Sequence, residues 1–261
     1  MADSKIVVSG TVDEFQKNVG SLIFRVVADA LKERDCATVG VSGTKAIADG
    51  FFTRILNVLV MEGGSMPKLV APLLCSETTI DWDKVRFFAV DERMVPIEDS
   101  ESNTGAYLRL LPEKFHKSFL PYGPIDDPET CARNYAAALL QFNPPMLNGM
   151  PQFDLLLLGH GPDGHTCSLF PGHPLLKNDK EIVAYINDSP KPPPRRITLT
   201  MPVVNNARNV AFISSGQNKA DIIKSILDNR DENLPAVMVR PVNGSLFWFL
   251  DSSAASKLKH K

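Results

Sequence analysis

Short, continuous apolar runs alternate along this chain with longer segments of helical periodicity, and this alternation constrains its fold more than any other feature. The run at 153–158 is the clearest strand, bounded by Pro151 and a glycine-rich loop. The segment 12–34 is the clearest helix, since apolar side chains recur at helical spacing behind Thr11 and Glu14, a capping-box signature. Apolar strands separated by amphipathic helices predict an α/β fold, with a mainly parallel sheet covered by helices on both faces.

The same patterns give the expected elements. Strands are expected at 5–8, 37–41, 85–90, 153–158, 181–186, 197–200, 210–214 and 246–250. Helices are expected at 12–34, from Ile47 to near Gly63, and at 103–115, 129–142 and 217–229, whereas 66–80 is ambiguous. The proline-rich stretch 189–194 is predicted to be an extended surface arm, because proline fixes φ and removes an amide donor. One domain is therefore expected over residues 1–261.

Charge and composition exclude two classes of partner. The chain carries 28 basic and 30 acidic side chains, for a formal charge of −2. A nucleic-acid binder needs a basic stripe to neutralise phosphates, so no nucleic-acid partner is expected. No apolar run approaches the ~18 residues of a membrane helix, so no membrane partner is expected either.

Cysteine usage and the chain ends bear on location. The chain has four cysteines without CxxC spacing: Cys36, Cys75, Cys131 and Cys167. This usage favours reduced thiols over a disulfide frame or a zinc site. Residues 1–5 lack the basic and apolar regions of a signal peptide. Residues 256–258, Ser-Lys-Leu, spell a peroxisomal address, but such addresses are read at the extreme C-terminus and three residues follow. A cytoplasmic location is expected, with an organellar fraction left open.

The first loop of chemical interest reads Ser42-Gly43-Thr44-Lys45, between an expected strand and an expected helix. Backbone N–H groups, two hydroxyls and the end of a helix dipole together form a cradle for an anion. A tight turn with serine or threonine as the helix cap explains the same residues. The spacing is not that of a Walker loop, and both interpretations stay open.

The second loop, Asp-Glu-Arg at 91–93, directly follows the expected strand at 85–90. Three adjacent charges are typical of a solvated exit from a sheet. Alternatively, Asp91 accepts a hydrogen bond from a substrate hydroxyl and Arg93 binds a phosphate or carboxylate. Residues 102–104, Ser-Asn-Thr, either cap the next helix or line the same pocket.

The third loop, at 159–172, reads Gly-His-Gly-Pro-Asp-Gly-His-Thr-Cys-Ser-Leu-Phe-Pro-Gly. Three glycines in its first six residues allow backbone conformations closed to other residues. Asp163 and His165 lie two positions apart, where a turn brings both into one cleft, and histidine suits proton transfer near neutral pH. A metal site at His160, Asp163 and His165 is disfavoured, because the spacing matches no zinc signature and no fourth ligand is visible. No metal is therefore expected.

These loops resemble the signatures of the 6-phosphogluconolactonase family. Residues 87–96, Phe-Phe-Ala-Val-Asp-Glu-Arg-Met-Val-Pro, with Ser-Asn at 102–103, look like the first signature. Residues 153–172 look like the second, whose Gly-x-Asp-Gly-His core is shared with glucosamine-6-phosphate deaminases. Ser-Pro-Lys-Pro-Pro at 189–193, with Arg-Arg-Ile-Thr-Leu-Thr at 195–200, resembles a third. The match runs nearly end to end.

The resemblance implies a Rossmann-like domain of the deaminase/ribose-phosphate-isomerase type. It further implies hydrolysis of 6-phospho-D-glucono-1,5-lactone to 6-phosphogluconate in the oxidative pentose phosphate pathway, without a metal or organic cofactor. In this family His165 corresponds to the general base, and residues 42–44 to the anion site. Lys219 of the Gly-x-x-Lys pattern and Arg196 correspond to phosphate ligands. The expected partner is the sugar-phosphate lactone alone, and a monomer is expected.

Two other functions stay open beside the lactonase. A deaminase moves protons at C1, C2 and the ring oxygen, and its loop typically carries a glutamate paired with the histidine. Residues 166–174 contain no carboxylate, which favours the lactonase. A non-catalytic sugar-phosphate regulator is expected to lack the loop histidine, and His165 is present.

A lactonase mechanism can be written with these residues. Neutral His165, oriented by Asp163, takes a proton from the water that attacks C1 and returns it to the departing ring oxygen. Loop N–H groups from Gly161 to Gly164 are expected to stabilise the oxyanion. Asp91 is expected to accept a hydroxyl hydrogen bond. The expected phosphate ligands are Ser42, Gly43, Thr44, Arg196 and Lys219, with Arg93 in support.

Overall fold

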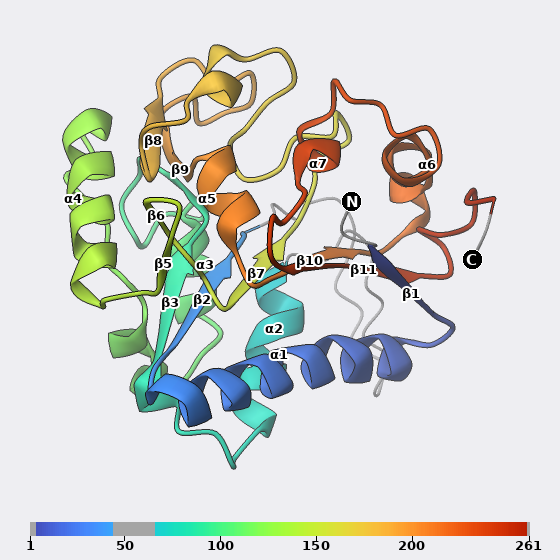
Figure 1. Cartoon of the computed structure of the whole chain (residues 1–261), viewed down its shortest axis with the longest axis horizontal. Coiled ribbons are helices and arrows are strands. Elements are labelled where there is room, and N and C mark those ends of the chain that lie inside the picture. The colour runs from blue at the N-terminus through green and yellow to red at the C-terminus, as the bar shows by residue number, and fades with distance from the viewer. Residues whose placement is uncertain (1–3, 44–65, 260–261) are drawn as a thin grey trace.

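A six-stranded sheet lies at the centre of the computed structural model, which describes residues 4–43 and 66–259 (Figure 1). The strand order is β1-β11-β10-β7-β2-β3, and all neighbours are parallel. The strands are β1 (Lys5–Ser9), β2 (Ala37–Val41), β3 (Val85–Ala89), β7 (Leu155–Leu158), β10 (Asn209–Ser214) and β11 (Ser245–Asp251). The predicted α/β fold with a mainly parallel sheet is confirmed. The predicted helix from Ile47 to near Gly63 lies outside the described residues.

Helices cover both faces of this sheet, so each strand divides its side chains between two cores. In β11, Trp248 and Leu250 belong to one core, whereas Phe247 and Phe249 belong to the other. The core containing Trp248 also includes side chains of α4 (Pro128–Gln141), α5 (Met201–Asn206), α6 (Ala220–Leu227) and α7 (Pro235–Met238). The opposite core includes α1 (Val12–Arg34) and α2 (Met66–Ser76). Burial on both faces explains the uninterrupted apolar runs.

A three-stranded antiparallel sheet beside the main one was not predicted. It consists of β4 (Asp91–Arg93), β9 (Arg196–Leu199) and β8 (Val183–Ile186), in the order β4-β9-β8. The predicted strands at 181–186 and 197–200 therefore belong to this second sheet. A short hairpin, β5 (Met146–Leu147) with β6 (Met150–Pro151), was also not predicted.

Two helical predictions need correction. The single helix predicted at 103–115 is instead α3 (Asn103–Leu108) followed by the 3₁₀ helix η2 (Glu113–Ser118). Pro112 lies between them, and a residue that precedes proline is disfavoured in the α region. The helix predicted at 217–229 is instead the 3₁₀ helix η4 (Gln217–Lys219) followed by α6. The remaining elements are α2, which resolves the ambiguous stretch, η1 (Trp82–Lys84) and η3 (Pro174–Lys177).

Within the described residues, no helix is long and apolar enough to cross a membrane.

Candidate active site

Four neighbouring strands of the main sheet end at the segments that carry the predicted site residues other than Arg196, which lies in β9. In the sheet order these strands are β10, β7, β2 and β3. Successive strands run toward one edge from β2 to β3, and toward the other from β7 through β10 to β11, so the order reverses between β7 and β2. Ligands of open parallel sheets bind at the carboxyl ends of the strands beside such a reversal. The strand order thus brings the predicted loops to one end of the sheet.

Asp163 and His165 form a hydrogen-bonded pair in the loop that follows β7. His165 Nδ1 lies 2.6 Å from Asp163 Oδ1, and the His165 side chain is 17% exposed. A carboxylate only accepts hydrogen bonds, so Nδ1 carries the hydrogen and Nε2 is left as the basic nitrogen. Within the part of the chain that the structure describes, no group is hydrogen-bonded to Nε2. The pair therefore has the arrangement of a histidine base with an orienting carboxylate.

The glycines of this loop make room for the pair. A Cβ built on Gly161 would overlap His165 Nδ1 and Asp163 Oδ1, so only glycine fits. The loop also uses its own amides: the Gly161 N–H donates to the His165 carbonyl at 2.9 Å, and the Gly164 N–H to the Gly161 carbonyl at 3.1 Å. Two of the predicted oxyanion donors are therefore already hydrogen-bonded. Pro162 has no N–H to donate. Of the predicted oxyanion donors, the Asp163 N–H is therefore the one still free to bind an oxyanion among the described residues.

Lys191, which sequence analysis did not select as a site residue, joins this pair. Its ammonium donates to Asp163 Oδ1 at 2.8 Å and lies 3.2 Å from His165 Nδ1. Burial raises the pKa of the Asp163 carboxyl, but hydrogen bonds from His165 and Lys191 outweigh it and hold that pKa well below its usual range. The available signal was the Ser-Pro-Lys-Pro-Pro motif, whose only side chain capable of carrying charge is Lys191.

His160, on the same loop, lies in a different environment. It is 4% exposed, and its Nε2 is 2.9 Å from Ser214 Oγ. Burial, followed by the nearby charge of Lys219, lowers the pKa of His160 to about 3, so the ring is neutral. Its carbonyl accepts a hydrogen bond of 3.0 Å from the Lys219 ammonium. Among residues 4–43 and 66–259, no three His, Cys, Asp or Glu side chains are placed to share a metal ion.

Lys219 lies at the end of η4, after β10, and its ammonium reaches the loop after β7. Burial, and then the charge of Lys191, lower the pKa of Lys219, and the charge of Asp163 acts in the opposite direction. Two partly buried ammonium groups at one end of the sheet favour an anionic ligand, because an anion offsets their mutual repulsion.

Of the two interpretations of residues 91–93, the solvated exit from the sheet is wrong. Asp91, Glu92 and Arg93 are all buried, because the chain enters β4 directly after β3. Glu92 accepts the backbone N–H groups of Arg93, Asn103 and Thr104, so it caps the start of α3. Burial raises the pKa of this carboxyl, and the backbone hydrogen bonds oppose that change.

Asp91 and Arg196 belong to a buried hydrogen-bond network that includes Ser168, on the same loop as Asp163 and His165. Ser168 Oγ donates to Asp91 Oδ2 at 2.8 Å, and Asn103 Nδ2 donates to Asp91 Oδ1 at 3.2 Å. Arg196 Nη1 donates to Ser168 Oγ at 3.3 Å. Both Asp91 oxygens thus have protein partners, and its predicted hydrogen bond to a substrate hydroxyl stays a prediction.

The arginines at 93 and 196 are directly opposite in the β4–β9 pairing. Arg93 Nη1 donates to the Glu101 carbonyl at 2.7 Å, whereas Arg93 Nε is buried without a hydrogen-bond partner among the described residues. Arg196 is 2% exposed and directs its guanidinium at the proline-rich arm, residues 189–194. The contacts of Arg196 point to a role other than binding phosphate. Phosphate binding stays a prediction for both arginines.

The first predicted anion loop is described up to Gly43. The Ser42 N–H donates to the Leu157 carbonyl, and the Ser42 carbonyl accepts from the Tyr107 hydroxyl at 3.0 Å. A Cβ on Gly43 would overlap the Asn103 side chain, so the chain passes close to the helix-capping segment here. Thr44 and Lys45 lie outside the described residues, and the cradle stays a prediction.

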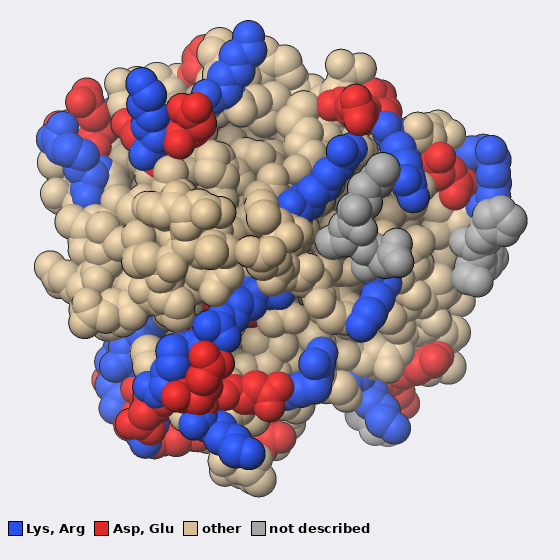
Figure 2. Space-filling model, in the orientation of Figure 1, with Lys and Arg blue, Asp and Glu red and all other residues tan. Residues whose placement is uncertain are grey.

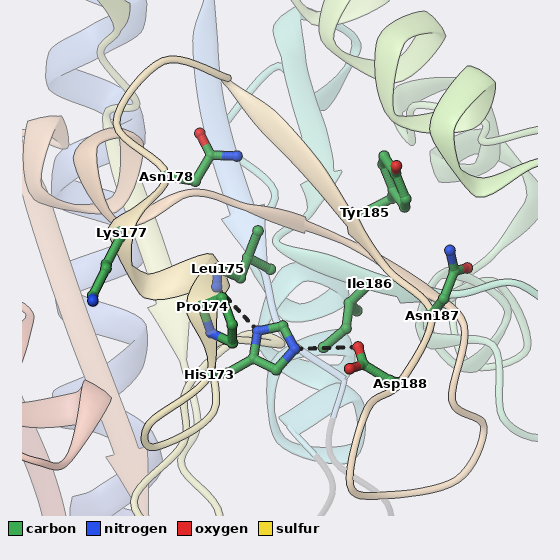
Figure 3. Close-up of a pocket in the computed structure, with 9 residues that line it drawn as sticks. All are labelled: His173, Pro174, Leu175, Lys177, Asn178, Tyr185, Ile186, Asn187 and Asp188. Atoms are coloured by element: carbon green, nitrogen blue, oxygen red, sulfur yellow. Dashed lines mark hydrogen bonds and ion pairs between the residues drawn. The ribbon is translucent and has the colours of Figure 1, made fainter.

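The surface gives two further observations. On the face drawn in Figure 2, Lys and Arg side chains are interspersed with Asp and Glu. An open groove of about 480 Å³ lies between residues 173–178 and 185–188. Its lining residues are drawn in Figure 3, where His173 points toward Asp188, and these two side chains pair at 3.2 Å. None of the predicted site residues lines this groove.

The chain is similar to known proteins both in sequence and in fold. The family model described as glucosamine-6-phosphate isomerases/6-phosphogluconolactonase matches residues 44–248. A 6-phosphogluconolactonase from Rattus norvegicus is 44% identical over 209 residues, which cover 77% of this chain and 80% of that protein. The structure of 6-phosphogluconolactonase from Trypanosoma cruzi superposes with a TM-score of 0.76 at 25% identity, covering 99% of this chain and 98% of that one. A monomeric glucosamine-6-phosphate deaminase shares the fold, with a TM-score of 0.68 at 19% identity over 97% of this chain and 100% of that one.

Proposed function

Since this chain belongs to the glucosamine-6-phosphate isomerase/6-phosphogluconolactonase family, we propose that it hydrolyses 6-phospho-D-glucono-1,5-lactone to 6-phosphogluconate, with His165 as general base. The observation that carries this proposal is the Asp163–His165 pair at the carboxyl end of β7. The pair leaves Nε2 as the one ring nitrogen that can accept a proton. The product belongs to the oxidative pentose phosphate pathway.

In this mechanism His165 acts twice. Neutral His165 accepts a proton at Nε2 from the water that attacks C1, and Asp163 holds the ring in the required tautomer. The imidazolium then donates the proton to the ring oxygen as the C1–O bond breaks. The Asp163 N–H is the donor assigned to the charge that develops on the carbonyl oxygen.

The phosphate is assigned mainly to Lys219. Its ammonium is partly buried, it comes from a different strand end than His165, and a phosphate would offset its repulsion from Lys191. The Ser42–Gly43 turn and Thr44 complete the proposed phosphate site. Arg93, at the end of β4, is assigned a supporting role in the same pocket.

A deaminase reaction is less well supported by the same residues. It needs a further acid beside the histidine, and residues 166–174 provide none. Asp163, the carboxylate hydrogen-bonded to His165, also accepts from Lys191, so it is held in the ionised form.

The proposal is tested by adding the purified chain to freshly prepared 6-phosphogluconolactone and following acid release in a pH-stat. We expect acid release far above the spontaneous rate, and no ammonia from glucosamine 6-phosphate. Ammonia release would support the deaminase. Binding of 6-phosphogluconate without lactone turnover would support a regulator.

A further inference from the structure

Arg196 donates hydrogen bonds to three consecutive carbonyls of the proline-rich arm. Its Nη2 bonds the carbonyls of Lys191 and Pro192, at 2.8 and 3.2 Å, and its Nε bonds that of Pro193 at 2.9 Å. A planar guanidinium can hold several acceptors at once in a fixed geometry, which an ammonium on a flexible stem cannot. This one buried side chain therefore anchors three consecutive residues of the arm.

The arm is also closed on itself, and this closure brings Lys191 to a defined place. The Ser189 N–H donates to the Pro194 carbonyl at 3.1 Å, and Ser189 Oγ donates to the Lys191 carbonyl at 2.9 Å. The Lys191 carbonyl thus has two donors, Ser189 and Arg196. The extended arm predicted from the sequence is instead a tightly bonded loop.

The anchored end of the arm adjoins the catalytic loop. The guanidinium of Arg196 lies 5.6 Å from the centre of the Phe170 ring, and that ring lies 4.7 Å from the ring of His165. Arg196 Nη1 also donates to Ser168 of the same loop. One residue thus touches both the arm that carries Lys191 and the loop that carries His165.

We propose that Arg196 is a positioning residue, which folds the proline-rich arm so that Lys191 neutralises Asp163 and keeps His165 available as a base. The proposal rests on the proposed lactonase function. Asp163 alone would stabilise protonated His165, which cannot accept a proton. Lys191 shares the same carboxylate oxygen and cancels much of this effect.

The charged groups around His165 come from several segments of the chain, and their positions support this role of Lys191. Asp163 and the neutral His160 lie on its own loop, Lys191 comes from the arm, and Lys219 comes from η4. Arg196 lies behind the Phe170 ring. Lys191 is the cation that contacts both members of the pair, so its removal should have the largest effect.

Lys191→Met should move the acid limb of the kcat profile to higher pH by about one pH unit, because an unopposed carboxylate favours the imidazolium. Activity on the acid limb then falls about tenfold, and Lys191→Arg should restore most of it. Arg196→Lys should show the same shift, and the double variant Arg196→Lys/Lys191→Met should lose little more than Lys191→Met alone. Arg195→Lys, at the neighbouring exposed position, is the matched control and should behave as the wild type.

Two substrates separate this role from phosphate binding. Arg196→Lys should reduce turnover of phosphorylated and unphosphorylated gluconolactone by the same factor. A rise in KM confined to the phosphorylated lactone, with an unmoved acid limb, would instead make Arg196 a phosphate ligand and overturn the proposal.

A readout without turnover keeps the inference separate from the proposed function. The His165 imidazole C–H resonance, titrated by NMR, should move to a higher midpoint in Lys191→Met and in Arg196→Lys. Identical midpoints in folded wild type and variants would refute the proposal, whichever reaction the protein catalyses.

Discussion

At the scale of single residues, two histidines five positions apart on one loop have different chemistry. His165 is partly exposed and pairs with a carboxylate, whereas His160 is buried against Ser214. His165→Ala removes the positioned base, which accelerates such reactions by roughly 10² to 10⁴. We expect kcat to fall by about that factor, whereas 6-phosphogluconate still binds. Steady-state kinetics and calorimetry measure the two quantities.

His160→Ala is the comparison for this variant, and its loss of kcat should be much smaller. Circular dichroism of both variants checks that the fold is retained. A folded His165→Ala protein with wild-type turnover would exclude the general-base mechanism.

Lys219 is expected to act on binding more than on catalysis. Lys219→Ala should raise KM for the phosphorylated lactone with a smaller change in kcat, because the phosphate is remote from C1. The loss of one charge-assisted hydrogen bond costs about 1.5–3 kcal/mol. Unphosphorylated gluconolactone is the control substrate and should be nearly unaffected; equal damage to both substrates would remove Lys219 from the phosphate site.

At the scale of elements, the loop after β7 depends on one glycine for space and on another for its backbone. Gly161→Ala places a methyl group against His165 and Asp163, so we expect kcat to fall at least tenfold, equivalent to about 1.4 kcal/mol. Gly172 has φ of 70° and open space around its Cβ position. Gly172→Ala should therefore lose about 1 kcal/mol of stability and keep its kcat. Kinetics and urea unfolding of both variants test this, and the reverse pattern would contradict it.

The elements also show what could be predicted from the sequence. The helix α1 has the predicted bounds, because its apolar spacing and its Thr11 cap are local signals. The pairing of β4 with β9 was missed, because it joins residues about a hundred positions apart and β4 consists of three charged residues. Asp163 and His165 were found because glycines and titratable groups share one short loop. The contacts of Lys191 and Arg196 arise only when the arm folds back on that loop, so sequence spacing could not predict them.

At the scale of the whole molecule, the buried His160 links folding to pH. Its pKa is about 3 in the folded protein, against an ordinary value of 6.5. Below pH 6.5 the unfolded chain therefore binds a proton that the folded protein does not. The stabilisation is complete above pH 6.5 and is lost as pH falls toward 3, by about 1.4 kcal/mol per pH unit. Burial, and after it the charge of Lys219, keep the imidazole of the folded protein neutral until the pH approaches 3.

His160→Gln should remove this part of the pH dependence, since glutamine can hydrogen-bond Ser214 and does not titrate. The free energy of unfolding, measured by urea denaturation, should fall between pH 6.5 and pH 5 by about 2 kcal/mol more in the wild type than in the variant. All other titrating groups are common to both proteins, so the difference isolates His160. His173→Gln, at the surface groove, is the matched control and should leave the His160 contribution in place. A wild type and a His160→Gln variant with parallel pH profiles would show that His160 binds its proton equally well in the folded and the unfolded protein, and its assignment as a buried neutral residue would fail.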